Sequence, residues 1–305
     1  MAKNILSKYV WLAETIYKAG YISFEDINRA WIGSDMDSHP IPIRTFHKWR
    51  IAIEDMFGLV IENENRGLYR YYISNADELK NGGMRSWLFN TLTVSNLMLD
   101  SMDIKDRIMF EEIPAGDEYL PVIIKAIKVN HLLYMTYQSY WRQEASSFEV
   151  EPYCIKAFKQ RWYLVGRSPY YNKIMIYALD RIHELGDTGS KFDYPKDYSP
   201  EEYFADCYGI IADKECKIEQ IVIKVSVGQA NYLRDLTLHQ TQKEIERNDE
   251  YSIFEVTLRP TFDFQQELLS MGESVEILKP IWLRKEIAGK IKRMWNKYSE
   301  CNGKV

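Results

Sequence analysis

The sequence predicts a multidomain α+β protein, and three observations support this fold class. Apolar residues recur at helical spacing between residues 5 and 57, strand-like segments separated by turn residues occupy residues 132–188, and strands alternate with helices from residue 218 onwards. The 305 residues are enough for two or three domains with a substantial core. With 46% hydrophobic and 27% charged residues, the composition is that of a folded globular protein.

The N-terminal region predicts three helices followed by a β-hairpin. Ser23 is an N-cap for the second helix, and Gly58 ends the third. A turn that contains Gly67 joins the two short strands. We expect helices at 5–19, 24–32 and 43–57, and strands at 59–62 and 68–73. This order of elements is typical of a winged helix-turn-helix, which we assign to residues 1–75.

A helical linker is predicted next, over residues 76–118. The polar stretch from Asn75 to Gly83 marks a domain boundary, because it ends in two glycines. Helical spacing returns over residues 84–102, and residues 107–110 are a candidate short strand. These elements are typical of a connector that often also serves as a dimerisation surface.

A small β-barrel is predicted for the region from Leu132 to Thr188. A helix that begins after Asp117 leads into it, with Pro121 in the first turn of this helix or kinking it. Several short strands at close spacing favour a barrel over a sandwich. We expect these strands at 132–140, 148–158, 161–168 and 174–178, the last one continuing into Arg181 and Ile182.

The strand at 161–168 places an aromatic residue and a cation side by side. Because side chains alternate along a strand, Trp162 and Leu164 point one way, where we expect core. Arg161 and Tyr163 point the other way. This second face offers a guanidinium fork beside a phenol, which suits an anion or a nucleotide.

The C-terminal region predicts a small α+β module of split βαβ, ferredoxin-like type. It follows a loop at about 187–216. Its strands are expected at 218–227, 239–245, 252–258 and 275–278, and its helices at 229–236, 262–271 and 282–298.

A net charge of −5 by itself argues against nucleic-acid binding. The basic and acidic residues are, however, concentrated in different parts of the chain. Phe46, Trp49 and Ile53 face inward at helical offsets, which leaves the basic side chains of the predicted third helix facing outward. In a winged helix this helix enters the major groove of double-stranded DNA. The predicted DNA contacts are Arg44, Thr45, His47, Lys48 and Arg50 on this helix, and Arg66 and Arg70 on the hairpin. The alternative is a solvated basic face and hairpin arginines that are merely exposed.

The sequence shows no signature of catalysis, metal binding or membrane insertion. It has no nucleophile motif, phosphate loop or metal-ligand histidine spacing, so we expect neither an enzyme nor a bound metal or cofactor. No apolar run approaches ~20 residues and no signal peptide is evident, so no membrane span is expected. Scattered cysteines indicate free thiols in a reducing cytoplasm. These are Cys154, Cys207, Cys216 and Cys301.

Three short blocks stand in one order at close intervals. They are Glu151-Pro152-Tyr153, Arg161-Trp162-Tyr163-Leu164-Val165 and Tyr177-Ala178-Leu179-Asp180-Arg181-Ile182. Together they resemble the signature blocks of the WYL-domain family of bacterial transcriptional regulators. The resemblance implies an Sm-like or SH3-like β-barrel over residues 119–190. It also implies a C-terminal extension over residues 191–305 that helps to assemble a homodimer or to shape the ligand site.

A narrower resemblance concerns the linker. Gly82-Gly83, the segment from Trp87 to Met102 and the loop at 39–50 resemble the regulator subgroup of gut Bacteroides-type bacteria.

The family resemblance implies that the barrel senses a ligand, often a nucleotide or nucleic acid, and relays its binding to the DNA-binding domain. The residues that it places at the ligand are Tyr137, Tyr153, Arg161, Tyr163 and Arg181, to which Lys156 adds a cation. Many members carry a histidine or another polar residue in place of Tyr153, and an Arg-x-Phe-x-x-Asp-Arg pattern where this chain has Tyr177 before Ala178. Ligand identity therefore does not carry over. The alternative for the two arginines is structural pairing or surface exposure.

These observations predict a cytoplasmic DNA-binding transcriptional regulator, a homodimer whose barrel senses an anionic effector. The alternative is an accessory module of a defence or DNA-processing system that binds single strands, which faces of aromatic and cationic residues also suit. The sequence leaves open the effector, the operator, activation or repression, and the oligomeric state.

Overall fold

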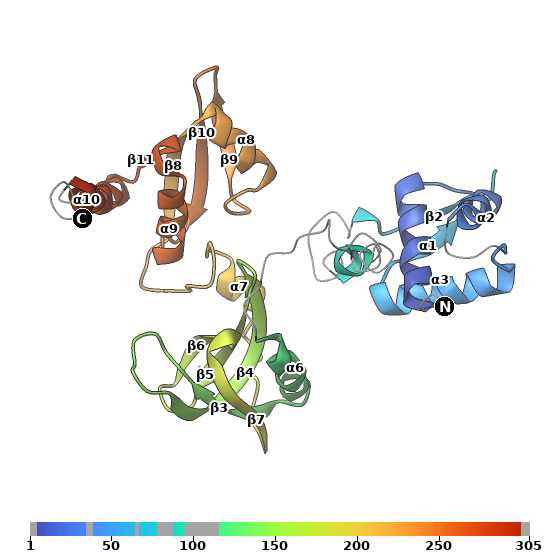
Figure 1. The fold of residues 1–305 in the computed structure, drawn as a ribbon, viewed down its shortest axis with the longest axis horizontal. Coiled ribbons are helices and arrows are strands. Elements are labelled where there is room, and N and C mark those ends of the chain that lie inside the picture. The colour runs from blue at the N-terminus through green and yellow to red at the C-terminus, as the bar shows by residue number, and fades with distance from the viewer. Residues whose placement is uncertain (1–4, 35–38, 65–66, 78–87, 95–115, 300–305) are drawn as a thin grey trace. The chain divides into compact units, whose positions relative to one another are not determined.

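The computed structural model describes residues 5–34, 39–64, 67–77, 88–94 and 116–299. The chain forms two compact units, residues 1–111 and 112–305, each with helices and β-structure (Figure 1). The mixed α+β class predicted from the sequence is confirmed. The division into four domains stays a prediction.

The first unit contains the three predicted helices and a two-stranded antiparallel hairpin. The elements are α1 Ile5–Ala19, α2 Phe24–Ile32, α3 Ile43–Phe57, β1 Ile61–Asn63 and β2 Tyr71–Ile73. Local signals set the helix ends: the Ser23 side chain accepts a hydrogen bond from the Asp26 backbone, and Gly58 adopts φ 65° after α3. The strands are shorter than predicted. Tyr69 takes a positive φ of 51°, which breaks the extended run that the sequence placed at 68–73.

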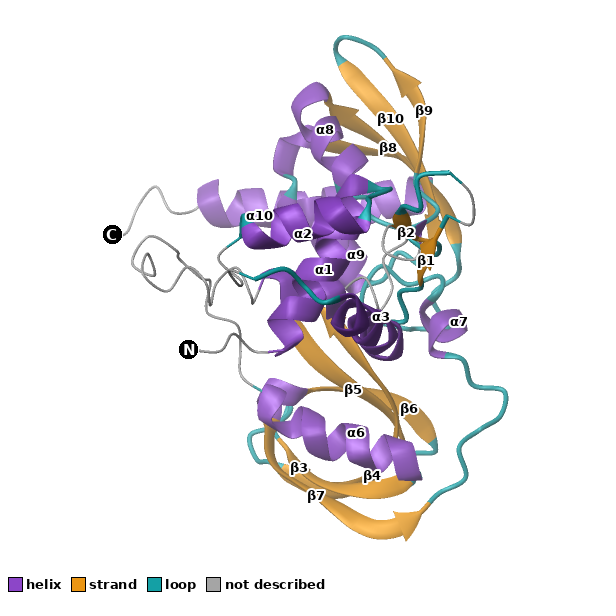
Figure 2. Ribbon diagram, turned by 90° about the vertical axis from the view of Figure 1, so that its right-hand side faces the viewer, coloured by secondary structure: helices purple, strands orange, loops and turns teal. Residues whose placement is uncertain are grey.

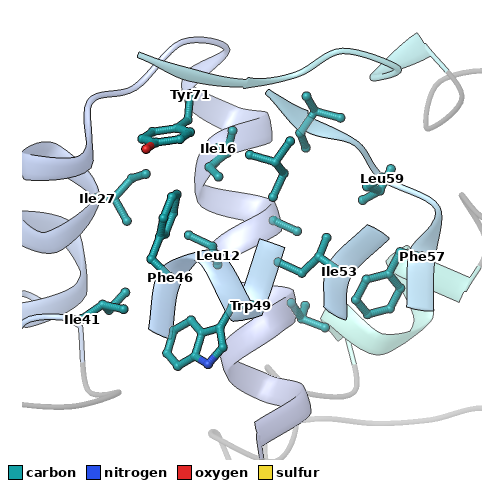
Figure 3. Close-up of a cluster of buried hydrophobic side chains, with 14 of the residues drawn as sticks. Leu12, Ile16, Ile27, Ile41, Phe46, Trp49, Ile53, Phe57, Leu59 and Tyr71 are labelled. Atoms are coloured by element: carbon teal, nitrogen blue, oxygen red, sulfur yellow. The ribbon is translucent and has the colours of Figure 1, made fainter. Parts of the chain in front are cut away.

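Aliphatic and aromatic side chains together fill the core of this unit (Figure 3). From α3, Phe46 and Trp49 point inward as predicted, and the Phe46 ring meets the Tyr71 ring edge-on at 4.7 Å. Residues 88–94 are helical, and Phe89 packs against Phe57 at 6.0 Å. The rest of the predicted helix at 84–102 and the predicted strand at 107–110 lie outside the described residues. Because one face of α3 is committed to this core, its opposite face is left to solvent.

The second unit begins with α6, Leu120–Val129, followed by a five-stranded sheet. Pro121 lies in the first turn of α6, as predicted. Ile123 and Ala126 on α6 are fully buried against one face of the sheet (Figure 2). The strands are β3 His131–Tyr137, β4 Ser146–Phe158, β5 Arg161–Ser168, β6 Lys173–Ala178 and β7 Ile182–Lys191. Their order is β6-β5-β4-β3-β7, and every neighbouring pair is antiparallel.

Two strand predictions in this sheet were wrong. The strand predicted at 132–140 ends at Tyr137, before a turn at residues 139–142. The strand predicted to continue from Ala178 into Arg181 is interrupted, because Leu179–Arg181 form a 3-10 turn. A further strand, β7, starts at Ile182 and pairs with β3. Arg181 is therefore held on a turn.

The remainder of the second unit is a four-stranded antiparallel sheet with helices. Its elements are β8 Glu219–Ser226, α8 Val227–Asp235, β9 Lys243–Arg247, β10 Tyr251–Leu258, α9 Phe262–Ser270, β11 Val275–Lys279 and α10 Ile281–Ser299. The strand order is β11-β8-β10-β9. The strand predicted at 239–245 starts only at Lys243, because Gln242 uses its side chain to bond the Leu238 and Leu233 backbones in a turn. A short helix that the sequence did not predict, α7 Pro200–Phe204, lies in the segment before this sheet.

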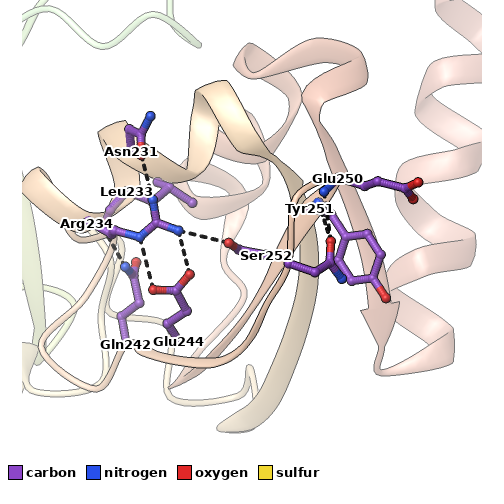
Figure 4. A network of polar contacts seen from close by, with 9 residues as sticks. Asn231, Leu233, Arg234, Gln242, Glu244, Glu250, Tyr251 and Ser252 are labelled. Carbon is purple, nitrogen blue, oxygen red and sulfur yellow. Dashed lines mark hydrogen bonds and ion pairs between the residues drawn. The ribbon is translucent and has the colours of Figure 1, made fainter.

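A polar network joins α8 to the edge of this sheet (Figure 4). The Arg234 guanidinium donates two hydrogen bonds to Glu244 on β9, at 3.0 and 2.6 Å. It also bonds Asn231 and Ser252, at 2.6 and 2.9 Å. These bonds favour the charged carboxylate and lower the pKa of Glu244 from its ordinary 4.5 to about 2.

Replacing Glu244 with glutamine is expected to lower the melting temperature at neutral pH. Since the folded-state pKa of Glu244 is depressed, its stabilisation is fully present above pH 4.5 and is lost as the pH falls towards about 2. Melting curves of the wild type and of Glu244→Gln should therefore differ above pH 4.5 and converge near pH 2. The matched control is Glu250→Gln on the neighbouring turn, which should melt like the wild type throughout. A constant difference across this pH range would contradict the assignment.

Candidate functional site

The solvent-facing side of α3 is basic. Arg44, His47 and Lys48 are exposed, and Thr45 is half-buried beside them. Ile51 on the same side is 62% exposed, and α3 has no acidic residue before Glu54. Four of the seven predicted DNA contacts therefore share one face with an apolar side chain. Such a face can donate to phosphates and contact base edges.

Arg50 differs from its neighbours on α3, because it points to the hairpin. Its guanidinium donates a hydrogen bond to the carbonyl of Ile61 on β1 and lies 5.3 Å from the centre of the Tyr71 ring. These contacts fasten α3 to both strands. Arg50 is thus occupied in holding the unit together.

Arg70 on the hairpin is paired with an acid. Its Nε and Nη2 each donate to the Glu64 carboxylate at 2.9 Å, and these hydrogen bonds lower the pKa of Glu64. The guanidinium also lies 5.2 Å from the Tyr21 ring centre. Its charge is therefore offset locally. Arg66 lies outside the described residues.

In the second unit, Arg161 and Arg181 flank a single phenol, that of Tyr140. The Arg181 guanidinium lies 4.2 Å from the centre of the Tyr140 ring, and interaction with the Tyr140 side chain contributes to the raised pKa of Arg161. Arg161 also pairs with Asp180 at 3.4 Å. We call these four residues the arginine cluster. The sheet and the 3-10 turn bring together two cations that are twenty positions apart in the sequence.

Two buried polar atoms in the arginine cluster have no hydrogen-bond partner among the residues that the structure describes. They are Oδ1 of Asp180 and Nε of Arg181. A buried polar atom without a partner costs free energy, and most folded proteins have few of them. With two guanidinium groups and one carboxylate, the cluster carries a net charge of about +1. This arrangement can accept one more anionic group, such as a phosphate or a carboxylate.

Exposed aromatic side chains adjoin the arginine cluster. Trp141, next to Tyr140, is 95% exposed, and Tyr170 and Tyr171 are 85% and 54% exposed. Arg142 donates to the Tyr171 hydroxyl at 3.5 Å, which joins the two loops that carry these rings. We call Trp141, Arg142, Tyr170 and Tyr171 the aromatic surface. Sequence reasoning treated residues 141–147 only as a turn, although the run Tyr140-Trp141-Arg142 was a visible signal for it.

Three of the predicted ligand residues are buried phenols. Tyr137 is 9% exposed, and its hydroxyl accepts a hydrogen bond from the Ala178 backbone at 3.3 Å. Tyr163 is 7% exposed. Tyr153 is 4% exposed, stacks on Phe192 at 6.0 Å and donates to Glu151 at 3.3 Å. Burial raises the pKa of Tyr137 and of Tyr153.

Both faces of β5 are therefore covered. Trp162 and Leu164 belong to the core, as predicted, and there they join residues of α6, but the face expected to be open packs too. Val165 on that face is fully buried with Phe204 of α7 and Cys207. Of the predicted ligand residues, Arg161 and Arg181 form the cluster and Tyr137 lies beside Arg181, at 5.5 Å. Lys156 lies elsewhere, in a separate cavity.

The start of the second unit packs directly against the turn that carries Arg181. Gly116 has φ 126°, a conformation that favours glycine. A methyl group at this position would lie 2.7 Å from the backbone nitrogen of Asp180. Glycine is therefore required here both for its conformation and for close packing.

Two domain families match the second unit. Residues 118–186 match the WYL domain, and residues 217–295 match the WCX domain. The chain thus contains a WYL domain followed by a WCX domain, the combination found in WYL-domain regulators. A comparison with curated proteins finds no match.

The solved structures that are similar to the chain include two described here. One is proteasome accessory factor B/C (PafBC) of Arthrobacter aurescens, with 16% identity and a TM-score of 0.36, over 92% of this chain and 45% of that chain. The present chain thus spans less than half the length of that protein. The other is a CRISPR Cas-related protein, with 12% identity and a TM-score of 0.39, over 98% of this chain and 88% of that chain.

Among the described residues, no helix is long and apolar enough to cross a membrane. Within the same part of the chain, no group of three or more histidine, cysteine or acidic side chains is placed to hold a metal ion.

Proposed function

We propose that the chain is a DNA-binding transcriptional regulator whose WYL domain senses an anionic effector, a nucleotide or a nucleic acid. The arginine cluster carries this proposal, because its two guanidinium groups outnumber its one carboxylate and suit an arriving phosphate. The proposed protein acts by binding, not by catalysis, and works in the cytoplasm. We also propose that the chain belongs to the subgroup of regulators from Bacteroides-type bacteria.

The first unit is proposed to be a winged helix-turn-helix that binds double-stranded DNA through α3. Its element order and the exposed side chains of Arg44, His47 and Lys48 support this assignment. In the second unit, we propose that the five-stranded sheet is an Sm-like barrel and that the four-stranded sheet is a ferredoxin-like module. A homodimer would present two α3 helices to a palindromic operator.

Effector binding would act by shifting the balance between arrangements of the two winged helices. It can do so only through a difference in effector affinity between these arrangements. A footprint of the purified protein on the DNA upstream of its own gene tests the proposal. A discrete protected palindrome is expected, and uniform or absent protection would overturn the regulator assignment.

An accessory module that binds single strands is the second candidate, and the aromatic surface favours it. Bases of any sequence can stack on exposed rings while nearby arginines contact the phosphates. Under this alternative, single-stranded DNA binds without any protected site on the duplex.

Replacing Trp141 with alanine is expected to weaken binding of a fluorescein-labelled thymidine oligonucleotide about tenfold. One stacked base contributes roughly 1–3 kcal/mol, and 1.4 kcal/mol is about a factor of ten. Fluorescence anisotropy measures the affinity. The matched control is Trp295→Ala, since Trp295 on α10 is also exposed, at 70%. Equal affinities for the two variants would exclude Trp141 from the binding surface.

A further inference from the structure

We propose that Lys156 is the anion-binding group of a second ligand site, which takes a small organic anion with an aromatic or apolar body. The site is an open cavity of about 730 Å³ within the second unit. The cavity is lined by strand β4, by the segment around α7 and by the residues just before β9. Its volume is in the range of small-molecule sites, roughly 300–1,000 Å³.

Lys156 differs from the other cations on β4 and β5 and at the turn between them, because those have carboxylate partners. Arg161 pairs with Asp180, Arg167 with Glu151 and Lys159 with Glu267. Among the residues that the structure describes, no carboxylate lies within ion-pair distance of Lys156. Its Nζ instead lies 4.1 Å from the centre of the Phe204 ring.

The environment of Lys156 disfavours its charge. The side chain is half-buried, and burial lowers the pKa of the ammonium group. Asp263 favours the charge from beyond ion-pair distance, but burial outweighs it, and an anion in the cavity would offset the free energy that this desolvation costs. Glu201 and Glu202 also line the cavity, and both are exposed to solvent.

His239 and the two cysteines around the cavity already have partners within the protein. His239 contacts the Ala205 carbonyl at 2.9 Å through Nε2 and Thr241 at 2.8 Å through Nδ1. Burial raises the pKa of the Cys154 thiol, and that of Cys207 to about 11, so both remain uncharged. Lys156 is therefore the group available to an anion.

The cavity walls select the rest of the ligand. Phe204 and Leu238 are 9% and 8% exposed, and with Ile155 they offer an apolar surface beside the ammonium. A ligand with an aromatic body and one acidic group satisfies both features. Neither Arg161 nor Arg181 lines this cavity, so the inference does not rest on the proposed effector site.

The test uses 1-anilinonaphthalene-8-sulfonate as the probe, because it joins an aromatic body to one anionic group. Lys156→Met keeps an unbranched side chain against Phe204 and removes the charge. In a fluorescence titration of the full chain, this variant should bind the probe about tenfold more weakly, as expected for the loss of one charged hydrogen bond. The control Lys173→Met, at an exposed position on β6, should bind like the wild type. N-phenyl-1-naphthylamine, which lacks the sulfonate, should not distinguish the two variants.

A second measurement locates the probe in the wild-type protein and needs no variant. The probe should slow acetylation of Lys156 by an N-hydroxysuccinimide ester but leave acetylation of Lys173 unchanged, as measured by peptide mass spectrometry. Unchanged acetylation of Lys156 at saturating probe, or equal affinities for the two methionine variants, would overturn the proposal. The Arg161→Met/Arg181→Met variant should retain probe binding, which separates this site from the proposed effector site.

Discussion

Replacing both Arg44 and Lys48 with alanine should weaken operator binding on the order of tenfold and reduce its salt dependence. Both side chains are exposed on the face of α3 that the core leaves free. If each neutralises one phosphate, the slope of log K against log salt should fall by about 2 in magnitude, since each contact contributes about 0.9. Fluorescence anisotropy on the footprinted duplex, at a series of salt concentrations, measures both quantities.

The matched control removes two other exposed cations of the same unit. In Lys18→Ala/Arg29→Ala the net charge changes equally, but the lost side chains lie on α1 and α2 and are 72% and 78% exposed. This variant should keep most of the affinity and the wild-type slope. A slope that Arg44→Ala/Lys48→Ala leaves unchanged would remove α3 from the DNA interface.

Loss of the effector response is expected when both arginines of the cluster are replaced by methionine. Arg161→Met/Arg181→Met removes the two guanidinium groups that flank Tyr140, so an anionic effector loses its charged hydrogen bonds. Each such bond contributes roughly 1.5–3 kcal/mol, so effector affinity should fall about a hundredfold or more. Operator affinity without effector should be retained. Anisotropy of labelled operator, with and without effector, measures the response.

Asp180→Asn is the control for this experiment, because Arg161→Met also removes the ion-pair partner of Asp180. The asparagine variant keeps both guanidinium groups and should respond to the effector. A parallel loss of operator binding in the methionine variant would indicate a folding defect. A normal response in that variant would place the effector site elsewhere.

Much of the architecture could be predicted because its signals are local. Ser23 and Gly58 set helix ends through hydrogen bonds and backbone conformation within a few residues. The inward positions of Phe46 and Trp49 follow from helical periodicity. These features depend on neighbours in the sequence, so the sequence alone determines them well.

The candidate site was less predictable, because segments that are distant in the sequence decide which side chains are buried and which stay exposed. Strand alternation correctly separated Trp162 from Tyr163, but it gave no indication that α7 and the residues near it cover the second face. Tyr153 likewise became a core residue through Phe192, about forty positions away. Lys156 and Arg161 are close in the sequence, yet Lys156 lines the cavity whereas Arg161 belongs to the arginine cluster.

At Gly116 the backbone packs tightly against the 3-10 turn at residues 179–181, so these two segments of the second unit should move together. The two backbones are so close that not even a methyl group fits between them, which leaves no slack to absorb a displacement. A ligand that displaces Arg181 by a fraction of an ångström would therefore also displace the backbone at Gly116, the first residue of the second unit that the structure describes. A side chain at position 116 would force the two backbones apart, because its Cβ would lie 2.7 Å from the backbone nitrogen of Asp180.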